Sequence, residues 1–205
     1  MAATLHRNSI LRAVLALFAS LALASCGINS VPAAEETAKA KWADVQAQYQ
    51  RRADLVGNLV STVKAAAKQE QDTLTRVTEA RSRATSVQVS ADDLADPAKV
   101  AQFQAAQGAL SQSLGRLLAT VEAYPDLKTN QNFLTLQSQL EGTENRIAVA
   151  VRDYNEAVRA YNTRIRTFPD MIGAKIIHGA KPMTPFEAKA GAENAPDVGG
   201  MFESK

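Results

Sequence analysis

The segment Phe133–Ile165, FLTLQSQLEGTENRIAVAVRDYNEAVRAYNTRI, decides the fold. Apolar residues, together with one threonine, recur in it every three or four positions, which is the period of an amphipathic α-helix. These positions are Phe133, Leu136, Leu140, Thr143, Ile147, Val151, Tyr154, Val158, Tyr161 and Ile165. Their mean spacing of about 3.6 residues predicts a nearly straight helix with little supercoil.

Two earlier segments carry the same pattern. We expect one continuous helix of roughly 70 Å over Thr37–Ser86, which contains no proline, and a second helix from Pro97 to about Ala123. The first stripe is Trp42, Val45, Tyr49, Val56, Leu59, Val63, Leu74, Val77, Ala84 and Val87, and the second is Val100, Phe103, Gln107, Leu110, Leu114, Leu117, Val121 and Tyr124. Arg52 and Glu70 interrupt the first stripe where an apolar side chain is due.

Helix-start signals support these boundaries. Ser90-Ala91-Asp92-Asp93 fits a capping box, Asp96 can cap the helix that begins at Pro97, and Thr129 or Asn130 can cap the third helix. Short connections make neighbouring helices antiparallel. We therefore predict an all-α protein, an elongated antiparallel bundle of three long helices plus a short C-terminal helix near Met171–Ile177 and a disordered tail. The predicted organisation is a signal peptide over 1–25, a linker over 26–36, the bundle over 37–178 and a flexible tail over 179–205.

The N-terminus has the pattern of an export signal. Arg7 and Arg12 precede the uncharged run VLALFASLALA at 14–24, which is shorter than the about 20 residues of a membrane-spanning helix. Leu23-Ala24-Ser25-Cys26 looks like a bacterial lipobox, and Cys26 is the only cysteine. We expect cleavage before Cys26 and acylation of its thiol, so that two or three acyl chains anchor the protein stably in a membrane.

Two alternatives to this anchor stay open. Cys26 can be a free thiol behind an ordinary signal, or the N-terminal helix can remain uncleaved in the inner membrane. Gly27, rather than an aspartate, follows the cysteine, and this favours the outer membrane for a lipidated, periplasm-facing chain.

The charge balance excludes an electrostatic nucleic-acid-binding protein. The chain has 23 Lys and Arg against 21 Asp and Glu, but Arg7 and Arg12 belong to the expected signal. The remainder is formally neutral, 21 against 21, and lacks the net positive charge of such proteins. Since a single cysteine allows no internal disulfide, the core must supply the stability.

The residues typical of catalysis are scarce. Outside the expected signal the only histidine is His178, and no spacing of His, Cys and acidic residues suits a zinc site or a nucleophilic triad. No glycine-rich phosphate loop occurs. We expect no enzymatic activity, no cofactor, no metal and no small-molecule substrate.

Polar side chains at helical spacing form a candidate interaction patch. On the third helix they are Asn145, Arg152, Asn155, Arg159, Asn162 and Arg166, and Tyr-Asn pairs at 154–155 and 161–162 repeat after seven residues. A similar group on the first helix comprises Arg51, Arg52, Asp54 and Asn58. One interpretation is a solvated face with a few buried hydrogen bonds that fix helix register. The other is that the two groups meet and dock an envelope partner.

A series of longer motifs follows in order along the chain. They are Gln50–Val60 (QRRADLVGNLV), Val63-Lys64, Glu122–Lys128 (EAYPDLK), Asn132-Phe133, Leu140–Ile147 (LEGTENRI), Arg152–Val158 (RDYNEAV), Tyr161-Asn162 and Phe168-Pro169. Together they resemble the LemA family over about residues 40–170. The resemblance implies an elongated helical bundle at the cell envelope without an established enzymatic activity. It also implies a protein partner, such as the TPM-domain membrane proteins with which members are often found.

Three hypotheses for the function remain. The one we favour is a lipid-anchored scaffold or adaptor for envelope proteins, which predicts stable partners and no turnover. A structural spacer rod predicts that surface substitutions are tolerated while changes of length are not. A ligand-binding protein or enzyme with a site between helices needs a pocket of convergent polar groups.

Overall fold

The structure, a computed structural model, describes residues 2–66 and 70–187, with the backbone alone for residues 2–13, 15–28 and 66. The described chain is all-α, as predicted, and contains no strand in those ranges. Its elements are α1 (Ala2–Ala66), α2 (Gln71–Ser86), the 3₁₀-helix η1 (Ala91–Ala95), α3 (Pro97–Val121), α4 (Pro125–Lys128), α5 (Gln131–Arg164) and α6 (Asp170–Ile176).

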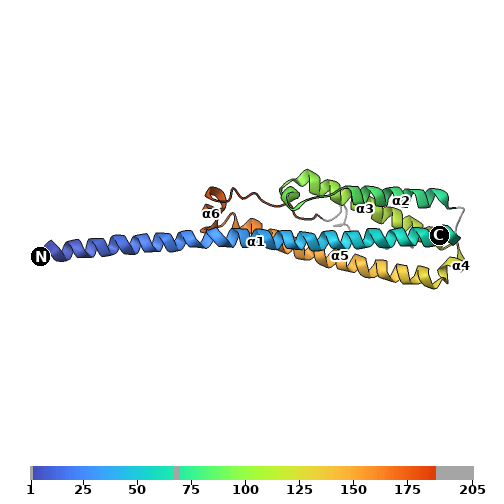
Figure 1. Cartoon of the computed structure of the whole chain (residues 1–205), viewed down its shortest axis with the longest axis horizontal. Helices are drawn as coiled ribbons and strands as arrows, with labels where there is room; N and C mark the ends of the chain where they lie inside the picture. The colour runs from blue at the N-terminus through green and yellow to red at the C-terminus, as the bar shows by residue number, and fades with distance from the viewer. Residues whose placement is uncertain (1, 67–69, 188–205) are drawn as a thin grey trace, which may run out of the picture.

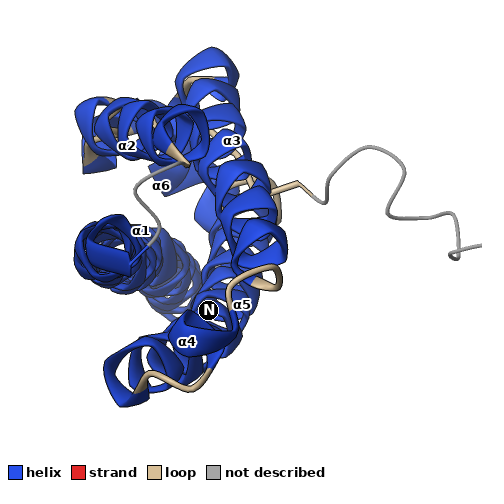
Figure 2. Cartoon of the chain, turned by 90° about the vertical axis from the view of Figure 1, so that its right-hand side faces the viewer, coloured by secondary structure: helices blue, strands red, loops and turns tan. Residues whose placement is uncertain are grey.

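The helices form an elongated antiparallel bundle. α1 and α5 make the most extensive helix pair, and α2 and α3 pair beside them (Figure 1). Viewed along the bundle axis, α2 and α3 lie on one side of α1, and α4 lies at the end of the bundle nearest the viewer (Figure 2). The N-terminal part of α1 projects beyond the other helices (Figure 1).

The core consists of two clusters along the bundle. The first cluster joins α1, α2, α3, α4 and the beginning of α5, and includes Leu55, Leu59, Val77, Leu117 and Phe133. The second, here called the aromatic cluster, lies toward α6 and includes Trp42, Tyr49, Phe103, Tyr154 and Tyr161. Burial of each such side chain contributes about 1.5–3 kcal/mol, so both clusters stabilise the bundle.

The helix predicted over Thr37–Ser86 is two helices rather than one. α1 ends at Ala66, and α2 begins at Gln71 and returns along the bundle (Figure 1). No large apolar residue occurs between Val63 and Leu74, so a straight continuation would bury little. Folding back instead places Leu74 and Val77 against the apolar face of α1. A helix of 16 residues therefore accompanies the three longer ones.

The predicted helix starts are confirmed by their hydrogen bonds. Asp96 Oδ1 accepts from the Ala98 amide at 2.9 Å, and Asn130 Oδ1 accepts from the Phe133 amide at 3.2 Å. Such N-caps contribute about 1 kcal/mol each. At the capping box, Asp93 accepts from the Ser90 amide at 3.0 Å. Hydrogen bonding to Lys99, followed by the bonds from Ser90, lowers the pKa of Asp93 to about 2.

The bundle extends further along the chain than predicted, at both its N-terminal and its C-terminal end. The predicted linker, 26–36, is part of α1, and Val31 is buried there because Ala174 of α6 packs into the same cluster. The predicted tail begins at 179, but residues 180–187 are held along α5, and this segment is called the strap below. α6 corresponds to the predicted short helix. Residues 188–205 lie outside the described chain.

Candidate functional site

Two asparagines of α5 bind the backbone of the strap. Asn162 donates through Nδ2 to the Met183 carbonyl at 2.8 Å and accepts through Oδ1 from the Met183 amide at 2.9 Å. Asn155 makes the same pair of bonds with Phe186, at 2.9 and 2.7 Å. Each asparagine thus satisfies both backbone groups of one residue, as a neighbouring strand would in a sheet.

The tyrosine that precedes each asparagine adds a third bond. Tyr161 Oη donates to the Lys181 carbonyl at 3.1 Å, and Tyr154 Oη donates to the Thr184 carbonyl at 2.8 Å. Burial raises the pKa of both hydroxyls, most strongly that of Tyr154. Both tyrosines are therefore neutral hydrogen-bond donors at physiological pH. The two Tyr-Asn pairs, seven residues apart on α5, thus form two matching sets of hydrogen bonds to the strap.

The strap also contacts η1 and the aromatic cluster. The Thr184 amide donates to the Leu94 carbonyl of η1 at 2.8 Å. The Phe186 ring joins the aromatic cluster, with its centroid 6.2 Å from that of Trp42 and 6.3 Å from that of Phe103. Met183 is buried in the same cluster. Backbone hydrogen bonds and two apolar side chains thus hold the strap in place.

A surface hollow of about 420 Å³ lies beside the strap. Its lining residues are Asn155, Val158, Arg159, Asn162, Thr163, Arg166 and Pro185. Arg159, on α5, and Arg166, two residues beyond the end of α5, are both exposed. Neither makes an ion pair with another described residue. The hollow therefore presents two guanidinium groups without an ion-pair partner beside the strap.

The remaining patch residues of α5 lie in solvent. Asn145 and Arg152 are exposed, and Arg152 pairs with the neighbouring Asp153 at 2.8 Å. On α1, Arg51, Asp54 and Asn58 are exposed as well.

The two predicted patches are not joined by a hydrogen bond or ion pair among the described contacts. Arg52 of the α1 patch pairs instead with Glu144 of α5, at 3.2 Å, and Glu144 was not part of the predicted α5 patch.

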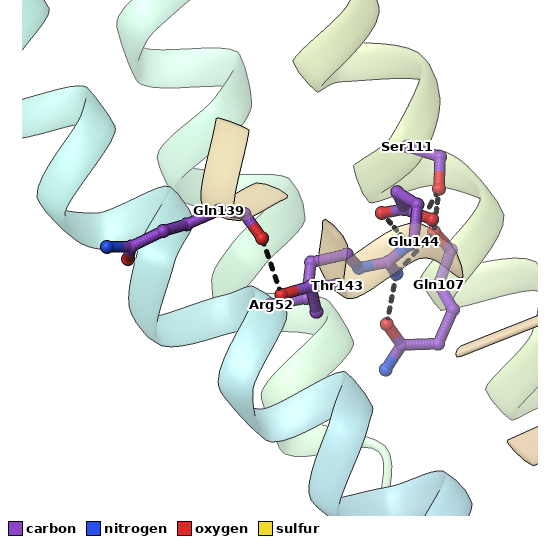
Figure 3. Close-up of polar contacts among 6 residues, drawn as sticks. All are labelled: Arg52, Gln107, Ser111, Gln139, Thr143 and Glu144. Carbon is purple, nitrogen blue, oxygen red and sulfur yellow. Dashed lines mark hydrogen bonds and ion pairs between the residues drawn. The ribbon is translucent and has the colours of Figure 1, made fainter. Parts of the chain in front are cut away.

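Arg52 is the centre of a polar network between helices (Figure 3). Its side chain is 2% exposed. Nη2 donates to the Gln107 side-chain oxygen at 2.6 Å and to the Gln107 carbonyl at 3.1 Å, while Nη1 donates to Ser111 Oγ at 2.9 Å. Gln107 in turn donates to the Ala84 carbonyl of α2 at 3.1 Å. With Glu144, the network joins α1, α2, α3 and α5 at one level of the bundle.

The surroundings of Arg52 are those of a buried charge. The Arg52 guanidinium also lies 4.8 Å from the centre of the Tyr49 ring, and its Nε has no hydrogen-bond partner in the structure. Burial raises the pKa of Tyr49, and the charge of Arg52 opposes this effect. A helix that slides by one turn would strand a buried charge, which costs several kcal/mol. The burial of Arg52 fits the first interpretation, and its role in helix register stays a prediction.

Several partners in these sites were outside the predicted patch. Tyr154 and Tyr161 belong to the apolar stripe and to the repeated Tyr-Asn pairs but not to the predicted patch, and Gln107 and Thr143 are polar members of otherwise apolar stripes. A polar residue within an apolar stripe is therefore the signal in the sequence that indicates a buried hydrogen bond. Thr143 Oγ1 donates to the Gln139 carbonyl at 2.7 Å (Figure 3). Glu70 fits the same rule, because it accepts from Tyr124 Oη at 2.7 Å.

The predicted lipid attachment site lies in a part of α1 of which only the backbone is described, so Cys26 stays a prediction. Within the described ranges, no helix is long and apolar enough for a membrane span. The same ranges hold no group of three or more His, Cys, Asp or Glu side chains placed to bind a metal ion. His178 is exposed, just after α6.

The fold and the site together define a class of protein. It is an elongated antiparallel α-helical bundle in which one long helix binds the backbone of the chain's own C-terminal strap. The chain belongs to the LemA family, whose model matches residues 41–199.

Curated relatives show the same affiliation. The chain is similar to the magnetosome proteins MamQ 1 and MamQ 2 of Paramagnetospirillum magneticum, each 26% identical over 172 residues that cover 76% of this chain and 63% of the relative. It is also similar to protein LemA of Metamycoplasma hominis, 26% identical over 125 residues that cover 60% of this chain and 52% of the relative. The chain therefore spans between 52% and 63% of the length of these relatives.

Proposed function

We propose that this protein is a lipid-anchored adaptor of the bacterial cell envelope, which docks a partner protein on α5 and catalyses no reaction. Membership of the LemA family supports the envelope location. The lipobox-like residues 23–26 support acylation of Cys26 and a periplasm-facing chain at the outer membrane.

The observation that carries the adaptor role is the hollow between the strap and α5. Arg159 and Arg166 flank it without an ion-pair partner in the described chain, and Pro185 of the strap forms its other wall. A guanidinium binds a carboxylate through two parallel hydrogen bonds, which gives both affinity and orientation. The partner surface that fits is therefore a segment that presents two carboxylates, one for each guanidinium. A TPM-domain membrane protein is the partner class that the family resemblance suggests.

The anchor is tested by the intact mass of the protein purified from the membrane fraction. We expect an N-terminus at Cys26 that carries acyl chains, and loss of this mass in the Cys26→Ser variant. An unprocessed or unacylated chain would refute the lipid anchor. Membrane attachment would then require the uncleaved apolar run 14–24.

Docking on α5 is tested separately by site-specific photo-crosslinking in living cells. The crosslinking amino acid replaces Thr163, which lies in the hollow, or Thr75, which is exposed on α2. We expect one discrete protein adduct from position 163 and none from position 75. The double variant Arg159→Glu/Arg166→Glu should abolish the adduct.

A matched charge reversal controls for the general effect of two added acids. Arg76 and Arg83 are also exposed and seven residues apart, but they lie on α2. Reversing both should leave the adduct at position 163 unchanged. If neither position yields an adduct, or if both reversals act alike, docking on α5 is refuted and the spacer rod becomes the better hypothesis.

A further inference from the structure

Among the residues whose side chains the structure describes, exposed apolar side chains concentrate around α6. Of the eight exposed large apolar residues in the described chain, five fall between 168 and 177, and these are Phe168, Met171, Ile172, Ile176 and Ile177. Ile176 is 78% exposed and Phe168 is 67% exposed. Single exposed apolar residues are ordinary on soluble proteins, whereas a contiguous group marks an interaction surface.

The orientation of α6 is the reverse of that in a typical surface helix. Its buried residues are its smallest, Gly173 and Ala174, and Ala174 packs with Val31 of α1 in the aromatic cluster. The large residues Ile172 and Ile176 point away from the bundle and are 50% and 78% exposed. A helix that covers a protein core buries its large apolar residues, so the outer face of α6 is built to contact something else.

The charges around this face have one predominant sign. Residues 164–181 contain four basic residues, Arg164, Arg166, Lys175 and Lys181, and one acidic residue, Asp170. Asp170 pairs with Arg164 at 3.5 Å. An apolar face with a basic rim is the composition of helices that lie in the interface of anionic membranes. An acidic lipid headgroup therefore fits this rim better than a neutral surface.

The position of α6 in the bundle brings it close to the proposed membrane anchor. Arg164 donates to the Ser30 carbonyl of α1 at 3.1 Å, next to α6. Ser30 lies four residues after Cys26, which is about 6 Å along a helix at 1.5 Å per residue. α6 lies at the end of the bundle from which the N-terminal part of α1 projects (Figure 1). An acyl anchor at Cys26 would thus place α6 at the lipid headgroups.

We infer that the outer face of α6 inserts its apolar side chains into the membrane interface and fixes the orientation of the bundle on the bilayer. This inference rests on the proposed membrane anchor. Interfacial helices bury their apolar face about 5–10 Å into the headgroup region, a depth that the offset between Cys26 and Ser30 permits. The start of α5 then points away from the membrane, while the docking hollow, which lies at the α6 end of α5, is held close to the headgroups.

The test uses the full-length lipidated protein in vesicles of phosphatidylethanolamine and phosphatidylglycerol. Acylation removes the thiol of Cys26, so that the variants Ile172→Cys and Ile176→Cys each offer one thiol for a nitroxide spin label. We expect both labels to be accessible to oxygen, which partitions into lipid, and to lose access to a water-soluble nickel chelate on reconstitution. Leu134→Cys is the matched control, because Leu134 is exposed near the start of α5, about 45 Å from Arg164 along the helix. Its label should remain accessible to the nickel chelate.

Vesicle flotation separates the two proposals. Protein that fails to float with the vesicles refutes the anchor. Protein that floats while labels 172 and 176 remain open to the nickel chelate refutes the α6 contact alone. Labels shielded from both oxygen and nickel also refute it, because they indicate a protein interface at α6.

Discussion

The buried network around Arg52 predicts that removing an acceptor costs more than removing the charge. The three variants are Gln107→Leu, Arg52→Met and the double variant. Gln107→Leu keeps the shape of the side chain but deletes the 2.6 Å bond from Arg52 and the bond to the Ala84 carbonyl. Arg52→Met replaces the buried guanidinium with an apolar chain of similar length.

The magnitudes follow from the contacts. A hydrogen bond to a charged group contributes about 1.5–3 kcal/mol and a neutral one about 0.5–1.5 kcal/mol, so Gln107→Leu should cost about 2–4 kcal/mol. Replacing a buried charge with apolar volume is often neutral or stabilising, and this gain offsets the about 1–3 kcal/mol for the unpaired Gln107 oxygen. Arg52→Met should therefore change the unfolding free energy by about 1 kcal/mol or less. The double variant should be more stable than Gln107→Leu alone, because it leaves no buried guanidinium that lacks an acceptor, and Glu144, which loses its partner, is 45% exposed.

The assay is equilibrium unfolding in urea, followed by far-UV circular dichroism in a mild detergent. Gln112→Leu, an exposed glutamine of the same helix, is the control and should lie close to the parent. In thermal melts the Gln107→Leu loss of about 2–4 kcal/mol should lower Tm by about 4–16 °C, given about 2–4 °C per kcal/mol for a chain of this size. The reasoning is refuted if Arg52→Met is the more damaging single change and the two effects add in the double variant. Such additivity would mean that Arg52 stabilises the bundle independently of its acceptor.

Three further predictions concern the strap, the buried tyrosines and the glycines. Asn162→Ala removes both bonds to Met183 and should cost about 2 kcal/mol locally, which native-state hydrogen exchange would detect as roughly 30-fold faster exchange of the Met183 amide. Asn145→Ala, at an exposed position, should leave that rate unchanged. Burial raises the pKa of Tyr154, Tyr161 and Tyr49 in the folded chain, so the unfolded state releases these protons first and stability is present below about pH 10 and lost as the pH rises further. Tyr154→Phe should flatten this loss in urea midpoints measured across alkaline pH, and an unchanged slope would contradict the assignment. Gly115→Ala should stabilise α3 by about 0.5–1 kcal/mol because an added Cβ meets nothing within 4 Å. Gly57→Ala should gain less in the same melts, since its Cβ would lie 3.2 Å from the Arg81 guanidinium carbon.

Local patterns were sufficient to predict the helices that bury a regular stripe. α5 could be predicted because its apolar positions remain in phase from Phe133 to Ile165, and its start because Asn130 has the chemistry of an N-cap. The end of α1 could not be predicted in the same way. Residues 64–70 contain only alanine and polar residues that are compatible with a helix. What decides the fold there is the contact of Leu74 with the apolar face of α1, and this is a non-local gain.

The candidate site could be predicted on one of its two sides. The polar spacing on α5 identified Asn155 and Asn162, but their partners are backbone groups of the strap, and backbone groups have no signature in a sequence. The sequence after Pro182 is rich in Gly, Pro, Ala and Glu, and this composition predicted a flexible tail where residues up to 187 bind α5. Arg52 was visible as a charge in an apolar stripe, but its acceptor Gln107 is supplied by a helix 55 residues away along the chain.

The strap has a consequence for the order in which the core closes. The first core cluster contains only residues from 55 to 140, so it can form once the beginning of α5 is available. The aromatic cluster joins Trp42 to Met183 and is complete only when the strap is present. In a chain that emerges N-terminus first, this cluster is therefore the last part of the core to close. If the chain is exported as proposed, the interval before the strap binds is the period in which periplasmic chaperones and proteases have access to that cluster.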